Sequence, residues 1–157
     1  MNRELVRMVM GYLGNVRGQV VVDMFCGIGN FTLPLARAGA RAVGIEASEE
    51  AVEMAKENAR VNRVDHASAF YAEDLYGEGG ALVSATDESD ETAPSDSSIN
   101  ARFEHFSRSP DALILDPPRS GAGLNLDGWA GIPSLKQIVY VSCNPVTFAE
   151  DAKRLEA

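Results

Sequence analysis

Short runs of valine, isoleucine, leucine and other apolar residues recur along the chain, and segments with helical periodicity separate most of them. The runs are QVVVDMF (19–25), ARAVGIE (40–46), ASAFYA (67–72), DALILD (111–116) and KQIVYVS (136–142). Nearly continuous apolar runs of this length are typical of strands buried on both faces. Strands that alternate with helices along the chain form parallel sheets. The alternation therefore predicts an α/β domain with a mainly parallel sheet and flanking helices.

The helical segments are predicted from apolar spacing and from the residues that begin and end helices. Residues 2–14 place apolar side chains at helical spacing, and residues 30–39 read as a helix that ends at Gly39. Ser48 is a good N-cap for a helix that runs to about Asn62. Pro145 is expected to be the first residue of a last helix, because proline is favoured at that position.

Length, charge and cysteine content restrict the class of protein. The 157 residues suit one domain, and the net charge of -9 argues against a large nucleic-acid footprint on this chain. Cys26 and Cys143 are too few for a disulfide framework or for a metal site with four cysteine ligands. There is no signal-peptide pattern at the N-terminus and no apolar run of the ~18 residues that a membrane span needs. We expect a cytoplasmic protein without a membrane segment or a metal.

Residues 77–100 interrupt the alternation. This stretch contains six acidic residues, no lysine or arginine, and many glycines, serines and threonines. Such a composition buries too little apolar surface to order itself. We predict a mobile acidic insertion between the third and fourth strands, and a solvated loop is a simpler interpretation than an acidic recognition segment.

The segment after the first predicted strand, DMFCGIGNF (23–31), opens a helix and contains Gly27 and Gly29. Glycine lets a backbone turn tightly and approach a ligand closely. Glu46 stands at the tip of the second strand, about 20 positions further on, where an acidic side chain binds the ribose hydroxyls of a nucleotide. Dinucleotide enzymes share this arrangement but prefer a third glycine, where this chain has Asn30-Phe31. The alternative is a pair of turn glycines without a ligand.

Two more loops follow predicted strands. Asp74 ends the third strand and is either an acceptor for an adenine amino group or an ordinary loop aspartate. In LILDPPRSGAG (113–123), Pro117 and Pro118 keep the backbone extended directly after the fourth strand. Such a stiff loop would present Asp116 to a cleft. The alternative is that the prolines only terminate the strand.

Three motifs together resemble one family. DMFCGIGNFTLPLA, LDPPRSGAG and VYVSCNP, in this order, are similar to motifs of the RNA uracil-5 methyltransferases, which use S-adenosylmethionine to form 5-methyluridine in tRNA and 23S rRNA. The resemblance implies a Rossmann-like class I methyltransferase fold, S-adenosylmethionine as cofactor and RNA as substrate. It implies cofactor contacts from Phe25, Asn30, Glu46 and Asp116, and Cys143 as the catalytic nucleophile. The general logic of class I methyltransferases adds Asp23, Gly27, Gly29 and Asp74 to the cofactor residues.

The chemistry of uracil methylation explains why a cysteine would follow the fifth predicted strand. Carbon 5 of uracil is a poor nucleophile, and a thiolate that adds to carbon 6 makes carbon 5 nucleophilic, which is covalent catalysis. The free N–H groups and partial positive charge at the start of a helix favour a thiolate there. A small buried apolar residue is the alternative for Cys143, and packing is our interpretation of Cys26.

Relatives in this family carry RNA-binding regions before such a core and a glutamate base after it. By spacing, that glutamate would lie beyond Ala157, so we expect 1–157 to be a catalytic core that ends after the fifth strand and its helix. Two other classes stay open. An amino-group methyltransferase of the Asp-Pro-Pro type would have an aromatic residue where Arg119 stands. A non-catalytic module that binds the cofactor is the other.

Overall fold

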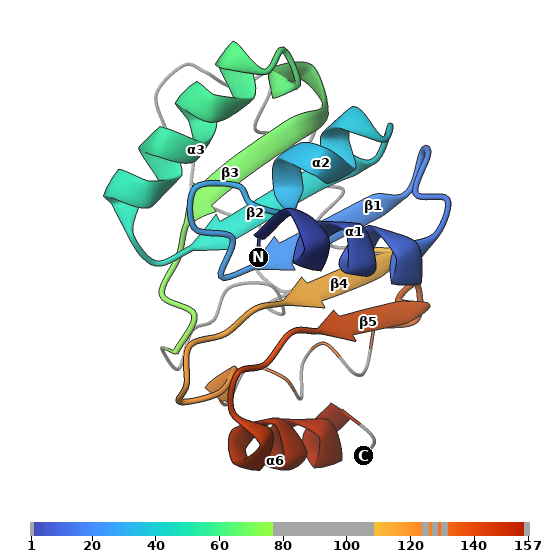
Figure 1. The fold of residues 1–157 in the computed structure, drawn as a ribbon, viewed down its shortest axis with the longest axis vertical. Coiled ribbons are helices and arrows are strands. Elements are labelled where there is room, and N and C mark those ends of the chain that lie inside the picture. Colours follow the sequence, from blue (N-terminus) through green and yellow to red (C-terminus); the bar gives the residue numbers. More distant parts are fainter. Residues whose placement is uncertain (1, 77–108, 124–125, 127–128, 130–131, 156–157) are drawn as a thin grey trace, which may run out of the picture.

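Five parallel strands form a single sheet in the computed structural model (Figure 1), which describes residues 2–76, 109–123, 126, 129 and 132–155. The strands are β1 (Val20–Met24), β2 (Arg41–Glu46), β3 (Ser68–Ala72), β4 (Ala112–Leu115) and β5 (Gln137–Tyr140). Their order is β3-β2-β1-β4-β5, and each neighbouring pair is parallel. The predicted α/β fold with a parallel sheet is confirmed. The predicted insertion at 77–100 lies outside the described residues.

Helices connect and flank the strands. Those whose bounds lie within the described residues are α1 (Asn2–Leu13), α2 (Thr32–Arg37), α3 (Glu49–Val61), the short 3-10 turn η1 (Asp65–Ala67) and α6 (Pro145–Leu155). Ser48 caps α3 as predicted, since its side chain accepts a hydrogen bond from the Ala51 N–H. The helix predicted at the end of the chain begins at Pro145, also as predicted.

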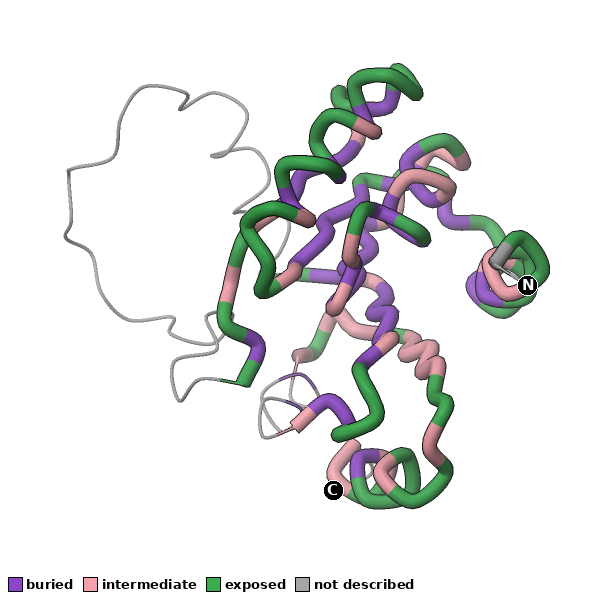
Figure 2. Tube along the Cα trace, turned by 60° about the vertical axis from the view of Figure 1, so that its left-hand side comes forward, coloured by how far each residue is buried: buried purple, intermediate pink, exposed green. Residues whose placement is uncertain are grey.

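The sheet has a hydrophobic core on each face, because successive side chains of a strand point to opposite sides. Val21 packs on one face with side chains from α1, α2 and α3, and Val22 packs on the other. That second face is covered by apolar residues around Ala122, Leu126 and Trp129. Figure 2 shows that buried residues concentrate along the strands in the middle of the molecule.

Two predicted elements are longer than the observed ones by three residues or more. The strand predicted at 136–142 ends at Tyr140, although the Val141 N–H still donates to the Leu115 carbonyl. Directly after it, the hydroxyl of Ser142 accepts a hydrogen bond from the Asn144 N–H in a local turn. The helix predicted at 30–39 covers only Thr32–Arg37. Its first residue, Thr32, donates both its N–H and its hydroxyl to Asp23, so the preceding residues belong to the loop after β1.

Candidate active site

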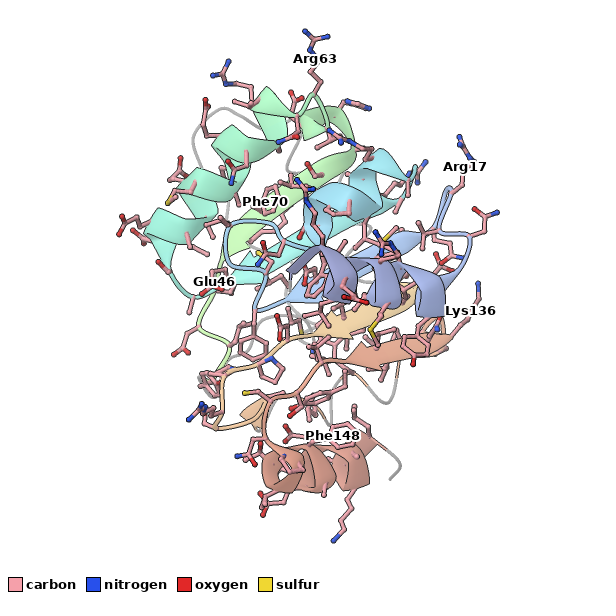
Figure 3. All side chains as sticks on the ribbon, viewed as in Figure 1. Arg17, Glu46, Arg63, Phe70, Lys136 and Phe148 are labelled. Atoms are coloured by element: carbon pink, nitrogen blue, oxygen red, sulfur yellow. The ribbon has the colours of Figure 1, made fainter. Side chains whose placement is uncertain are left out.

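All the side chains predicted for the site lie at one edge of the sheet or in the loops that follow it. Parallel strands end at the same edge, and open α/β sheets bind ligands there. Asp23 is the fourth residue of β1 and Glu46 the last of β2. The others follow the strands: Phe25, Gly27, Gly29 and Asn30 after β1, Asp74 after β3, Asp116 after β4, and Cys143 after β5. Figure 3 shows Glu46 at this edge, close to the ends of β1 and β2.

The loop after β1 has a backbone that few residues adopt. Gly27 and Gly29 have positive φ angles of 54° and 94°, which glycine takes without strain. Phe25 also has a positive φ, 63°, and for a bulky residue this costs on the order of 1–3 kcal/mol. Its half-buried ring contacts that of Tyr76 at a centroid distance of 5.8 Å. Strain of this kind persists where the surrounding structure imposes it, and it clusters at functional sites.

The carboxylate of Glu46 organises two neighbouring segments. Oε2 accepts a hydrogen bond from the Gly27 N–H at 3.0 Å, and Oε1 accepts from the N–H groups of Ala47 and Ser48 at 2.9 and 3.2 Å. A carboxylate has about four lone-pair positions, so Glu46 retains capacity for a hydroxyl donor. Glu46 is half-buried at the tip of β2. It therefore fixes the glycine loop and can accept from a ligand with the same group.

Asp23 is fully buried beneath this loop. Its Oδ2 accepts hydrogen bonds from the N–H and the hydroxyl of Thr32, at 2.9 and 2.5 Å. No donor from the described part of the chain reaches Oδ1. Burial raises the pKa of Asp23 to about 7, because desolvation outweighs the Thr32 hydrogen bonds and the negative charges of Asp116 and Glu46 add to it.

Asp116 and Asp74 differ in their surroundings. Asp116 is half-buried directly after β4, and burial raises the pKa of its carboxyl group. Asp74 is exposed, and its Oδ1 accepts a hydrogen bond from the Tyr76 N–H at 2.9 Å. This is a local turn contact, so the cofactor role of Asp74 stays a prediction.

The two cysteines occupy opposite environments. Cys143 is exposed, in the loop directly before α6. Asn144 caps this helix, since its Oδ1 accepts a hydrogen bond from the Val146 N–H at 3.1 Å. Cys26 is buried in the core, where desolvation and the nearby carboxylates of Asp23 and Glu46 raise the pKa of its thiol. The interpretation of Cys26 as a packing residue is confirmed.

Two residues of the site were not predicted from the sequence. Thr32 holds Asp23, and the Tyr76 hydroxyl donates a hydrogen bond to the Gly121 carbonyl at 2.9 Å. A threonine at the start of the helix after the glycine loop was the available signal for the first contact. The sequence gives no signal for the contact of Tyr76, because its partner lies 45 residues further along the chain.

A cavity of about 390 Å³ opens between α2 and α3, beside the glycine loop. Gly29 and Asn30 belong to its lining, together with Ile28, Leu33, Pro34, Arg37, Asn58 and Asn62. Glu46 and Asp116 do not line it. The cavity therefore meets the predicted cofactor loop but does not coincide with the carboxylates at the strand ends.

No group of three or more His, Cys, Asp or Glu side chains in the described ranges is arranged to hold a metal ion. Among the described helices, none has the length and apolar character of a membrane span.

The strand order, the glycine loop after β1 and the acidic tip of β2 define the class I methyltransferase fold. A solved structure of an S-adenosylmethionine-dependent O-methyltransferase from Thermotoga maritima superposes with a TM-score of 0.66 at 19% identity, over 98% of this chain and 49% of that one. The crystal structure of Pyrococcus abyssi tRNA (uracil-54, C5)-methyltransferase with S-adenosyl-L-homocysteine gives a TM-score of 0.69 at 32% identity. It covers 99% of this chain and 31% of that chain.

The particular family follows from sequence comparison. The model of the tRNA (Uracil-5-)-methyltransferase family matches residues 1–157, and the chain belongs to this family. The 23S rRNA (uracil(1939)-C(5))-methyltransferase RlmD of Neisseria lactamica is 41% identical over 152 residues, which is 96% of this chain and 29% of that protein. The chain thus spans about 30% of the length of the curated relatives that it matches. The family resemblance read from the three motifs is confirmed.

Proposed function

We propose that residues 1–157 form the catalytic core of an enzyme that uses S-adenosylmethionine to methylate carbon 5 of a uridine in RNA. The observation that carries this proposal is the joint placement of the three family motifs at one sheet edge, with an exposed cysteine in the last of them. The tRNA and rRNA substrates in the names of the relatives support RNA as the partner.

The residues at the sheet edge fit S-adenosylmethionine. The cofactor carries a positively charged sulfonium and ammonium and a ribose with two hydroxyl donors. Glu46 has free acceptor capacity for one of those hydroxyls, and the carboxylates of Glu46 and Asp116 are close enough to Asp23 to raise the pKa of Asp23. Such a concentration of negative charge favours a cationic ligand. Phe25, Gly27, Gly29, Asn30 and Asp74 complete the proposed cofactor residues.

Cys143 is the proposed nucleophile. Its thiolate adds to carbon 6 of the uracil ring, and the electron pair of the C5–C6 double bond moves into the ring enolate, which makes carbon 5 nucleophilic. The bound cofactor supplies the electrophilic methyl group for carbon 5. A base then removes the proton from carbon 5, the C5–C6 double bond re-forms, and Cys143 leaves as the thiolate. A uracil that is flipped out of an RNA stack can react only with an accessible thiol, and Cys143 is exposed.

Identification of the methylated nucleoside tests this function. The gene product that carries this chain is incubated with labelled S-adenosylmethionine and uridine-containing RNA, and the nucleosides are separated after digestion. We expect 5-methyluridine from the wild type, none from Cys143→Ala, and normal amounts from the control Cys26→Ala if that variant folds. A label on the amino group of adenine would establish the Asp-Pro-Pro alternative instead. Cofactor binding without transfer to any RNA would establish the non-catalytic one.

A further inference from the structure

Helix α6 carries a row of polar side chains on one face. Asn144 precedes the helix, and Thr147, Asp151 and Arg154 follow at intervals of three or four residues, the spacing that places side chains on one side of a helix. All four side chains contact the backbone of a single segment, residues 119–123, which we call the arginine–glycine loop. This loop continues from Asp116 through the two prolines.

The contacts are hydrogen bonds to main-chain atoms. The Asn144 Nδ2 and the Thr147 hydroxyl donate to the carbonyl of Arg119, at 3.0 and 3.3 Å. The Arg154 guanidinium donates to the carbonyl of Gly123 at 3.0 Å. Asp151 Oδ2 accepts from the Ala122 N–H at 2.7 Å. The helix that begins two residues after Cys143 therefore holds the loop that follows Asp116.

Asp151 is the buried member of this row. It is 6% exposed, and the oxygen that accepts from Ala122 also accepts from the Tyr140 hydroxyl at 2.5 Å. This contact raises the pKa of Tyr140, after the larger effect of burial. One carboxylate thus joins the end of β5, the arginine–glycine loop and α6. Its removal would leave the buried Ala122 N–H without an acceptor.

The loop lies directly against the helix. Gly121 has a φ of 88°, and a Cβ atom there would lie 2.8 Å from Asp151 Oδ2 and 3.2 Å from the Thr147 Cβ. A side chain at this position would therefore push the loop away from α6. Glycine is needed at 121 for both the backbone angle and the close approach.

The other side of the loop is held by Tyr76. Its hydroxyl donates to the Gly121 carbonyl, and its ring contacts Phe25 of the proposed cofactor loop. Contacts thus run without a break from the cofactor loop through Tyr76 and the arginine–glycine loop to α6. Cys143 lies at the start of that helix, one residue before Asn144. This chain of contacts connects the segment that carries Cys143 to the proposed cofactor loop.

We propose that Asp151 is a positioning residue, which fixes α6 against the arginine–glycine loop and thereby sets Cys143 relative to Asp116 and the cofactor. This inference rests on the proposed function. The hydrogen bonds described for Asp151 join it to Ala122 and Tyr140 and not to a proposed cofactor residue or Cys143, so its removal should leave S-adenosylmethionine affinity nearly unchanged. A displacement of the nucleophile lowers the rate of the chemical step, and a shift of about 1 Å costs about 100-fold.

The test compares Asp151→Ala, Asp151→Asn and the exposed neighbour Glu150→Ala in the gene product that carries this chain. S-adenosylmethionine binding by calorimetry gives the number of folded sites and the affinity, and kcat is expressed per folded site. We expect Asp151→Ala to lower kcat about 10- to 100-fold with the dissociation constant for the cofactor unchanged. Asparagine has the same shape and keeps an acceptor oxygen, so Asp151→Asn should recover most of kcat. Glu150→Ala should match the wild type.

Equal kcat per folded site in Asp151→Ala and wild type would overturn the inference, and so would a loss that appears only as weaker cofactor binding. If Asp151→Ala fails to fold, Gly121→Ala displaces the same loop from α6 and should show the same selective loss of kcat. A retained kcat in folded Gly121→Ala refutes the role of the loop. An inactive wild type would refute the proposed function. An active wild type together with any one of the contrary results above would refute this inference alone.

Discussion

Replacement of Asp23 by asparagine is expected to flatten the dependence of the chain's stability on pH. Burial raises the pKa of Asp23 from 3.8 to about 7 in the folded chain. Between these values the folded state binds more protons than the unfolded state, so the free energy of unfolding falls as pH rises through the window. A shift of about 3 pKa units corresponds to about 4 kcal/mol at 1.36 kcal/mol per unit. This loss is complete above about pH 7.

Asparagine has the same shape and does not ionise in this range. Its carbonyl oxygen can take the place of Oδ2 and accept from the N–H and hydroxyl of Thr32. The free energy of unfolding is measured by urea titration without ligand at several values between about pH 4 and about pH 8, for the wild type, Asp23→Asn and the exposed control Asp65→Asn. We expect the free energy of unfolding of Asp23→Asn to increase by up to about 4 kcal/mol relative to that of the wild type as pH rises, and that of the control to increase little. A difference between Asp23→Asn and the wild type that stays constant with pH would refute the reasoning.

Three further outcomes are expected. Glu46→Ala should weaken S-adenosylmethionine binding by about 1–3 kcal/mol in calorimetry, the cost of charge-assisted hydrogen bonds to the ribose and the glycine loop, and unchanged affinity would contradict the ribose role. Iodoacetamide should alkylate the exposed Cys143 well before the buried Cys26, as mass spectrometry of timed samples would show, and the reverse order would count against the site. Tyr76→Phe should lower the free energy of unfolding by about 0.5–1.5 kcal/mol, because it removes the hydroxyl that donates to the Gly121 carbonyl and lies 3.5 Å from the Ser120 hydroxyl, and no change in urea titration would mean that the bond to Gly121 is not made in solution.

The position of the site could be predicted from the sequence because parallel strands end at one edge. Once Glu46 and Asp116 are recognised as strand-end residues, the topology alone brings them to that edge. The glycine loop and the helix that begins at Pro145 follow from local preferences for turns and first helical positions. These features depend on short segments in which the residue types alone favour the observed conformation.

The contacts that hold the site together could not be predicted in this way. Asp151 meets Ala122, 29 residues away, only because α6 docks on the loop, and nothing in either segment indicates the partner. The positive φ of Phe25 contradicts the preference of its residue type, so it is imposed by the surrounding structure. Strand β5 ends at Tyr140 and is followed by a turn in which the Asn144 N–H donates to the hydroxyl of Ser142, where apolar content alone suggests a longer strand. Two expectations stay predictions: that residues 1–157 form a single methyltransferase core, and that the protein is cytoplasmic.

The covalent role of Cys143 is the central claim, and a substrate analogue tests it most directly. With RNA that contains 5-fluorouracil, fluorine replaces the proton on carbon 5 and cannot leave as a proton does, so the final elimination stalls. The gene product that carries this chain is incubated with this RNA and S-adenosylmethionine, digested and sequenced by mass spectrometry. We expect a methylated fluorouridine adduct on the peptide that contains Cys143 and no adduct with Cys143→Ala. An adduct on Cys26, or normal methylation of ordinary RNA by Cys143→Ala, would contradict the proposed mechanism.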